Sequence, residues 1–249
     1  MMPLRPFPVI LALAGVALVA TGCESTQSKS AKIAEELGPV KQEKGLKISK
    51  RSKDVVVVSS TLLTDEAGSA VVVEVRNDSD RNLVNVPIAI DVRDAKGKSV
   101  YRNDLPGLET GLAAIPYIEA GETMFWVHDQ VLATETPEKV EVTVGAGGTP
   151  FSGDVPKFTA TEPKLEGDPF SGVVADGNIV NESGQDQSRV LLYAVAREGD
   201  EVVAAGRGAI EKVKPEPKPL PYNIYFIGDP RQADVSVTLF PTLPGFEEE

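Results

Sequence analysis

The sequence predicts an all-β protein built from two tandem antiparallel β-sandwiches. Strand-length segments alternate apolar and polar residues, turn-forming residues separate these segments, and the pattern returns after residue 170. No long helical pattern accompanies the strands. The chain has 249 residues, which is enough for two sandwiches of about 100 residues each.

The chain begins with a short apolar run from Val9 to Ala20, preceded by Arg5. The run is shorter than the roughly 20 residues that cross a bilayer as a helix, and its layout is that of a removable export signal. The end of the run, Val19-Ala20-Thr21-Gly22-Cys23, resembles the lipobox of bacterial lipoproteins. The resemblance implies a signal peptide over residues 1–22 and a mature N-terminus at Cys23 that carries diacylglycerol and a further acyl chain such as palmitate. The alternatives are a plain secretory signal followed by an incidental cysteine, or a strand of a cytoplasmic protein.

Residues 23–51 are expected to be a basic, flexible tether that holds the body near the membrane. They are rich in Ser, Lys and Glu and poor in large apolar residues. Residues 24–53 carry a net charge of +4, whereas residues 54–249 carry −17. An acidic body argues against nucleic acid as its partner. A basic tether is attracted to an anionic membrane surface, although a merely solvated linker would have a similar composition.

The first sandwich is expected over residues 52–146. Apolar and polar residues alternate in 71–77, 86–94 and 139–145, which predicts three half-buried strands. Turn signals lie at 77–80, 95–98 and 119–122. Gly and Pro are frequent in 145–156, which favours a linker over residues 147–154.

The second sandwich is expected over residues 155–246 because three segments of the first copy recur in the same order. Asn77-Asp78-Ser79 corresponds to Asn181-Glu182-Ser183. Residues 86–97 align with 190–200, and residues 140–144 align with 235–239. An accidental likeness between two all-β stretches is the alternative.

The repeat resembles the small FxLYD and CARDB-like immunoglobulin-type domains of bacterial envelope proteins. The second copy carries it in the stretch 177–183 followed by Leu191-Leu192-Tyr193, and the first copy in 88–91 followed by the turn 94–97. The aromatic residue that names the FxLYD motif is missing from both copies. The resemblance implies an immunoglobulin-like fold and implies no reaction.

The chemistry-bearing residues give little support for catalysis, so the chain is predicted not to be an enzyme. Its single histidine, His128, stands beside Asp129, but neighbouring strand residues point to opposite faces. A partly exposed structural histidine is therefore expected. The oxygen-rich stretch 77–80 lacks the pattern of a calcium loop and is expected to be a side-chain-stabilised turn. Neither a metal nor a cofactor is expected, and with Cys23 lipidated no disulfide can form.

The aromatic stretches 116–129 and 220–230 occupy corresponding places in the two copies and are apolar on both strand faces. We expect either that loops or the neighbouring domain cover the second face, or that this face binds a partner through Met124, Trp126, Tyr222 and Tyr225. The sequence thus favours a lipid-anchored module, outside the cytoplasm, that binds another envelope protein. A capture protein for a small molecule or a cell-wall polymer is the alternative, and the sequence does not indicate which partner or ligand is bound.

Overall fold

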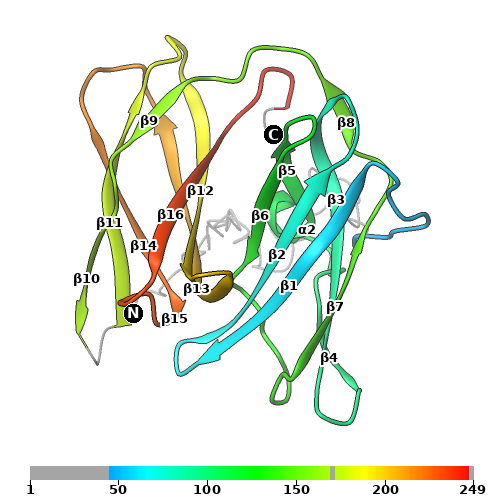
Figure 1. Cartoon of the computed structure of the whole chain (residues 1–249). Coiled ribbons are helices and arrows are strands. Elements are labelled where there is room, and N and C mark those ends of the chain that lie inside the picture. The colour runs from blue at the N-terminus through cyan, green and yellow to red at the C-terminus, as the bar shows by residue number, and fades with distance from the viewer. Residues whose placement is uncertain (1–44, 169–171, 247–249) are drawn as a thin grey trace, which may run out of the picture. The chain divides into compact units, whose positions relative to one another are not determined.

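The computed structural model describes residues 45–168 and 172–246, and the regular secondary structure in this part is almost entirely strand (Figure 1). The predicted all-β fold of antiparallel sheets is confirmed. The predicted signal peptide, Cys23 and the predicted tether up to residue 44 lie outside the described residues. No helix in the described part is long and apolar enough to cross a bilayer.

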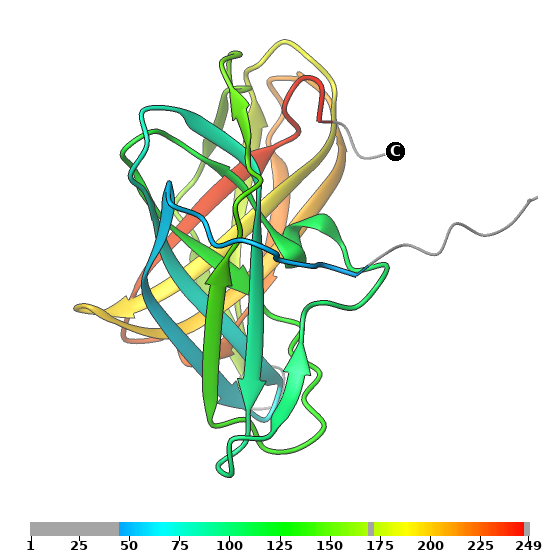
Figure 2. The ribbon, with the colours of Figure 1, turned by 90° about the vertical axis from the view of Figure 1, so that its right-hand side faces the viewer.

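The first half of the described chain forms two sheets that enclose a core. Strands β1-β2-β6 make one sheet, and β3 is the centre of the other, with β4 and β5 on one side and β7 and β8 on the other. Figure 2 shows β3 and β7 side by side. The elements are β1 (Val55–Asp65), β2 (Gly68–Asn77), β3 (Asn82–Arg93), β4 (Ser99–Arg102), α2 (Thr110–Ala113), β5 (Ala114–Ile118), β6 (Thr123–His128), β7 (Lys139–Val144) and β8 (Thr149–Phe151).

The second half repeats this arrangement. Strands β10-β11-β14, with β9 also on β11, form one sheet, and β15-β13-β12-β16 form the other. The elements are β9 (Phe158–Ala160), β10 (Lys164–Asp168), β11 (Gly172–Asn181), β12 (Gln187–Glu198), β13 (Glu201–Val213), β14 (Leu220–Tyr225), β15 (Ile227–Gly228) and β16 (Asp234–Pro241).

Strand register supports the internal repeat that the sequence indicates. The alignment makes Ile88 equivalent to Leu192 and Val144 equivalent to Leu239. In the structure Ile88 lies opposite Val144 across β3 and β7, and Leu192 lies opposite Leu239 across β12 and β16. Equivalent residues therefore pair with equivalent residues.

The two Asn-x-Ser turns also match in atomic detail. The side-chain amide of Asn77 donates to the Arg81 carbonyl (2.7 Å), and that of Asn181 donates to the Gln185 carbonyl (2.8 Å). In each turn the Asn oxygen accepts from both the backbone N–H and the hydroxyl of the Ser two residues on. The expected side-chain-stabilised turn is present at both places.

The two halves share a core, because the sheet β1-β2-β6 of the first half faces the sheet β15-β13-β12-β16 of the second. Residues Val190, Leu192 and Ala194 of β12 pack into the core of the second half, whereas Tyr193 and Val195 pack into the core of the first. The strand β12 is therefore buried on both faces. The described residues of both halves accordingly belong to one compact unit.

Two segments that were expected to be flexible take part in the first half. The predicted linker 147–154 contains β8, which pairs with residues 82–84 of β3. Its glycines serve close packing, since a Cβ on Gly148 would lie 2.6 Å from a methyl group of Val86. At the end of the predicted tether, the Lys50 carbonyl accepts a hydrogen bond from the N–H of Ala146 (2.8 Å). Residues 45–51 therefore include contacts to the body.

Candidate binding groove

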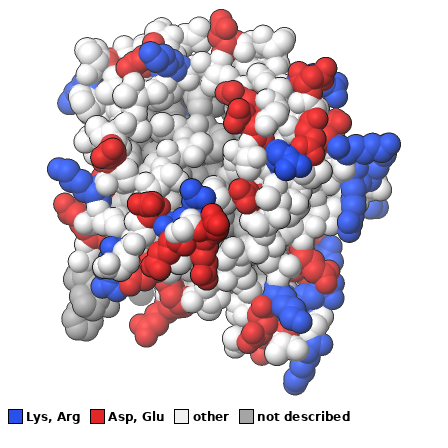
Figure 3. Space-filling model, viewed as in Figure 1, with Lys and Arg blue, Asp and Glu red and all other residues white. Residues whose placement is uncertain are grey.

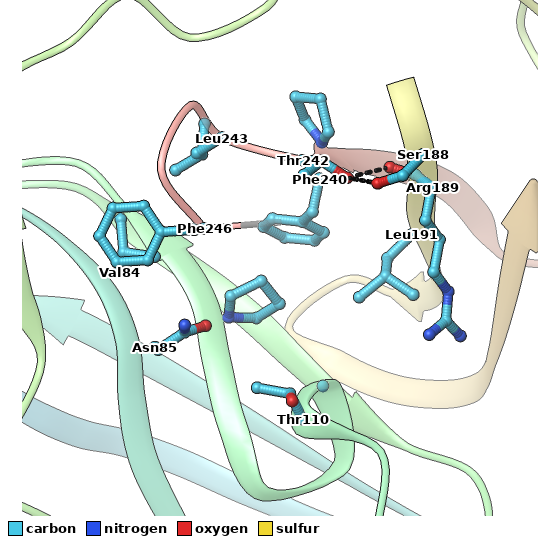
Figure 4. A pocket seen from close by; sticks show the side chains of 13 residues that line it. Val84, Asn85, Thr110, Ser188, Arg189, Leu191, Phe240, Thr242, Leu243 and Phe246 are labelled. Atoms are coloured by element: carbon cyan, nitrogen blue, oxygen red, sulfur yellow. Dashed lines mark hydrogen bonds between the residues drawn. The ribbon is translucent and has the colours of Figure 1, made fainter. Parts of the chain in front are cut away.

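A small cavity lies where the two halves meet, and we call it the seam cavity (Figure 4). Its volume is about 80 Å3, and its walls come from β3, α2 and β5 of the first half and from β12, β16 and the C-terminal segment of the second. Phe240, Leu191 and Phe246 are among the apolar side chains that Figure 4 shows around the hollow. Its polar atoms are largely occupied, because the Thr242 hydroxyl donates to the Arg189 carbonyl (2.8 Å) and lies 3.1 Å from the Ser188 hydroxyl.

The wall of the seam cavity contains one unusual backbone conformation. Asn85 has φ of 52°, in the left-handed region that residues other than Gly rarely adopt. It lies in β3 between residues that pair with β5, and Pro116, another residue of the cavity wall, lies between their partners. Since Pro has no N–H to offer, β3 can bend here without losing a ladder hydrogen bond from that residue.

A larger groove begins where the seam cavity ends, and we call it the edge groove. Both hollows are lined by Phe240, Pro241 and Leu243, and the edge groove has a volume of about 370 Å3. One side is the last part of β16, from Thr238 to Pro241, and the other comes from β5, β6 and the turn between them. Its remaining lining residues are Tyr117, Ile118, Glu119, Glu122, Met124 and Val155. The space-filling view shows a hollow of mostly uncharged surface between the two halves (Figure 3).

Beside these hollows, a cluster of charged residues joins the two halves. The Arg207 side chain is only 6% exposed, and its guanidinium lies 2.7 Å from one carboxylate oxygen of Glu109. The other oxygen of the same carboxylate lies 3.0 Å from the guanidinium of Arg189. Asp129 accepts a hydrogen bond from the backbone N–H of Arg207 (3.1 Å). Burial raises the pKa of Asp129, and the positive charge of Arg207 opposes that shift. Each carboxylate therefore has an arginine partner, which suits a structural role at the seam.

His128 is fully buried, so the expectation of a partly exposed histidine is wrong. Its Nδ1 accepts from the backbone N–H of Gln130 (3.3 Å), which leaves Nε2, 2.9 Å from the Tyr101 hydroxyl, as the protonated nitrogen of the neutral ring. Burial and the charge of Arg207 lower the pKa of His128 to about 3. As expected, Asp129 does not orient this ring, because it faces Arg207 instead. No group of three or more metal-binding side chains occurs among the residues the structure describes.

The four residues proposed from the sequence to bind a partner do not form one surface. Trp126 is completely buried, and its indole N–H donates to the carbonyls of Gly111 (2.9 Å) and Ala114 (3.1 Å). Tyr222 is also buried. Tyr225 is 66% exposed on β14 of the second half, whereas Met124 lines the edge groove in β6 of the first. Of the four, only Met124 belongs to the candidate site.

The second apolar face of β6 is covered by the other half of the chain. Trp126 and His128 point into the core of the first half, whereas Phe125 lies under the guanidinium of Arg197, 5.7 Å from its ring centre. The expectation that a neighbouring domain would cover this face describes the arrangement seen.

The sequence did not predict that residues of β16 would line the edge groove. The lack of charge from Val235 to Phe240 was the available signal.

Comparison with family models, with curated proteins and with solved structures finds no match to this chain.

Proposed function

We propose that this chain is a lipid-anchored envelope protein without catalytic activity, and that the edge groove binds another envelope protein. The anchor rests on the sequence around Cys23, and the resemblance to FxLYD and CARDB-like domains, which remains a prediction, agrees with a binding role. The observation that carries the proposal is the groove itself. It places mostly uncharged surface from both halves beside the last part of the edge strand β16, where a partner can bury apolar area without a cofactor.

Photo-crosslinking in the native host tests this proposal. A photoreactive amino acid at Thr238, exposed on the groove wall, should give a crosslinked product with an envelope protein that mass spectrometry identifies. The matched control places the same amino acid at Asn223, which is exposed on β14 and lies outside the groove. Equal products at both positions, or none at Thr238, would refute the groove as the binding site.

The lipid anchor has its own test. Cys23→Ala should move the chain from the detergent phase to the aqueous phase of a detergent extraction, because two or more acyl chains are needed for stable anchoring. If the variant stays in the detergent phase as completely as the wild type, the anchor is not at Cys23.

Capture of a small molecule is the second candidate, and the seam cavity is the observation that favours it. The cavity is lined mainly by apolar residues, as small-ligand sites are, but its volume of about 80 Å3 suits only a small group. Thr110→Phe would fill the cavity from its wall. This variant should abolish small-molecule capture and leave the crosslink from Thr238 intact if the protein-binding role is correct.

A further inference from the structure

We propose that the partner adds an extended strand with Lys or Arg side chains to the free edge of β16. The inference rests on the proposed function and specifies the kind of partner that the edge groove takes. It follows from the direction of the β16 backbone, the lack of edge protection on this strand and the charge of the groove.

The backbone of β16 presents hydrogen-bonding groups that no described strand pairs, and the strand lines the groove from Thr238 to Pro241. The N–H of Thr242 donates to the Arg189 carbonyl of β12 (3.2 Å), and residues of an antiparallel strand face their partner alternately. Thr238 and Phe240 therefore also face β12. The N–H and C=O groups of Val235, Val237 and Leu239 point away from it, and no described strand pairs with that side of β16. An incoming strand at the usual spacing of about 4.8 Å would satisfy them.

The edge of β16 lacks the features that block strand addition at other edges. The register of β16 on β12 is continuous over eight residue pairs, and Asp234 is its only charged residue. By contrast, β1 has an irregular register near Val57, and β10 carries Lys164 and Glu166. Pro241 ends the open stretch, because it faces outward and has no N–H.

The charge of the groove indicates what this strand carries. Among the residues that the structure describes, Glu119 and Glu122 are the only charged ones that line the groove, and both are exposed. They lie in the turn between β5 and β6, across the groove from the last residues of β16. Residues 54–249 carry a net charge of −17, which also favours a cationic partner. Apolar or β-branched residues suit the groove beside Leu239 and Met124, and Lys or Arg suits the acidic turn.

The probe is a displayed library of random nine-residue peptides. It is selected for binding to the full-length chain, which is kept in detergent. We expect enrichment of peptides that combine alternating β-branched residues with Lys or Arg. Backbone N-methylation at alternate positions of such a peptide should weaken its binding at least tenfold. Val237→Pro should have a similar effect, because it removes an outward N–H in the way that Pro241 already does. The urea midpoint and the emission of Trp126 show whether the Val237→Pro variant is folded. If it is unfolded, the binding of the N-methylated peptides to the wild-type chain tests strand addition instead.

The role of the acidic turn is tested with the double variant Glu119→Gln and Glu122→Gln. This double variant should weaken the enriched peptides at least threefold at low salt and less at high salt. The matched control is Glu135→Gln with Glu138→Gln, two exposed acids that do not line the groove and should have no effect.

Three results would overturn the proposal. The first is that no peptide is enriched, and the second is that the enriched peptides tolerate both N-methylation and Val237→Pro. The third is that the wild type sediments as a dimer and Val237→Pro as a monomer, because the edge would then pair with a second copy. If strand addition fails in these assays while the crosslink from Thr238 persists, the interaction role stands and only the mode of binding is wrong.

Discussion

Replacing the two repeated asparagines tests whether the turns hold the sandwiches together. Asn77 is fully buried, and its amide donates to the carbonyls of Arg81 (2.7 Å) and Glu119 (3.0 Å) while its oxygen accepts two hydrogen bonds from Ser79. A net hydrogen bond contributes about 1 kcal/mol, and its loss leaves buried groups unpaired. Asn77→Ala should therefore lower the free energy of unfolding by about 2–4 kcal/mol.

Asn181→Ala should cost a similar amount, because its side chain makes the equivalent bonds and is only 5% exposed. The matched control is Asn178→Ala, an exposed position in the same strand, which should change stability by less than about 0.5 kcal/mol. Urea unfolding measured by circular dichroism and by the emission of Trp126, the only tryptophan, gives these values.

Asn77→Asp adds a pH test of the same turn. The aspartate would place a negative oxygen against two carbonyls in a buried site, so its pKa in the folded state should be raised above that in the unfolded state. The loss in free energy of unfolding caused by Asn77→Asp is then largest at pH values above the pKa of the folded state. It becomes smaller as the pH falls below that pKa, because the protonated acid can again donate to the Arg81 carbonyl. A cost below about 1 kcal/mol for Asn77→Ala, or equal stability of the Asp and Asn forms at pH 7, would refute this account of the turn.

Three further outcomes are expected. The ring protons of His128, the only histidine, should not shift in NMR spectra between about pH 7.5 and 4.5, because its folded pKa is about 3. As the pH falls from 6.5 toward 3, the unfolded chain protonates His128 while the folded chain does not, so the free energy of unfolding should decrease over this range. A titration of the ring near pH 6.5 in the folded protein would contradict its burial. Arg207→Met should lower the free energy of unfolding by about 3 kcal/mol in urea melts, because it leaves the partly buried Asp129 without an arginine and Glu109 with Arg189 alone. Arg231→Met breaks only an exposed pair with Asp229 and should cost much less, so equal costs would argue against a structural role for the charged residues at the seam. Trp126 should emit at short wavelength and resist quenching by acrylamide, and red, easily quenched emission would show that β6 is open to solvent.

The sequence by itself determined several of the strands, the turns between them and the internal repeat, although it predicted a linker where β8 lies. Alternation with a period of two is a local property, and so is the bonding of an Asn side chain to a backbone two to four residues away. The alignment of the two copies even gave the correct partners, since Ile88 pairs with Val144 and Leu192 with Leu239. The alternation and the turns need no knowledge of the other half of the chain, and the repeat needs only its sequence.

Only the tertiary structure decided which apolar surfaces are covered and where the candidate site lies. Trp126 and Tyr225 looked alike in the sequence, but the shape of the whole chain buries the first and exposes the second. Arg207 meets Glu109, 98 residues away, and Asp129, 78 residues away, and pairs so distant leave no periodic signal. The edge groove likewise depends on how β16 meets the turn between β5 and β6. Burial depends on what packs against a face, and a sequence pattern records only that the face is apolar.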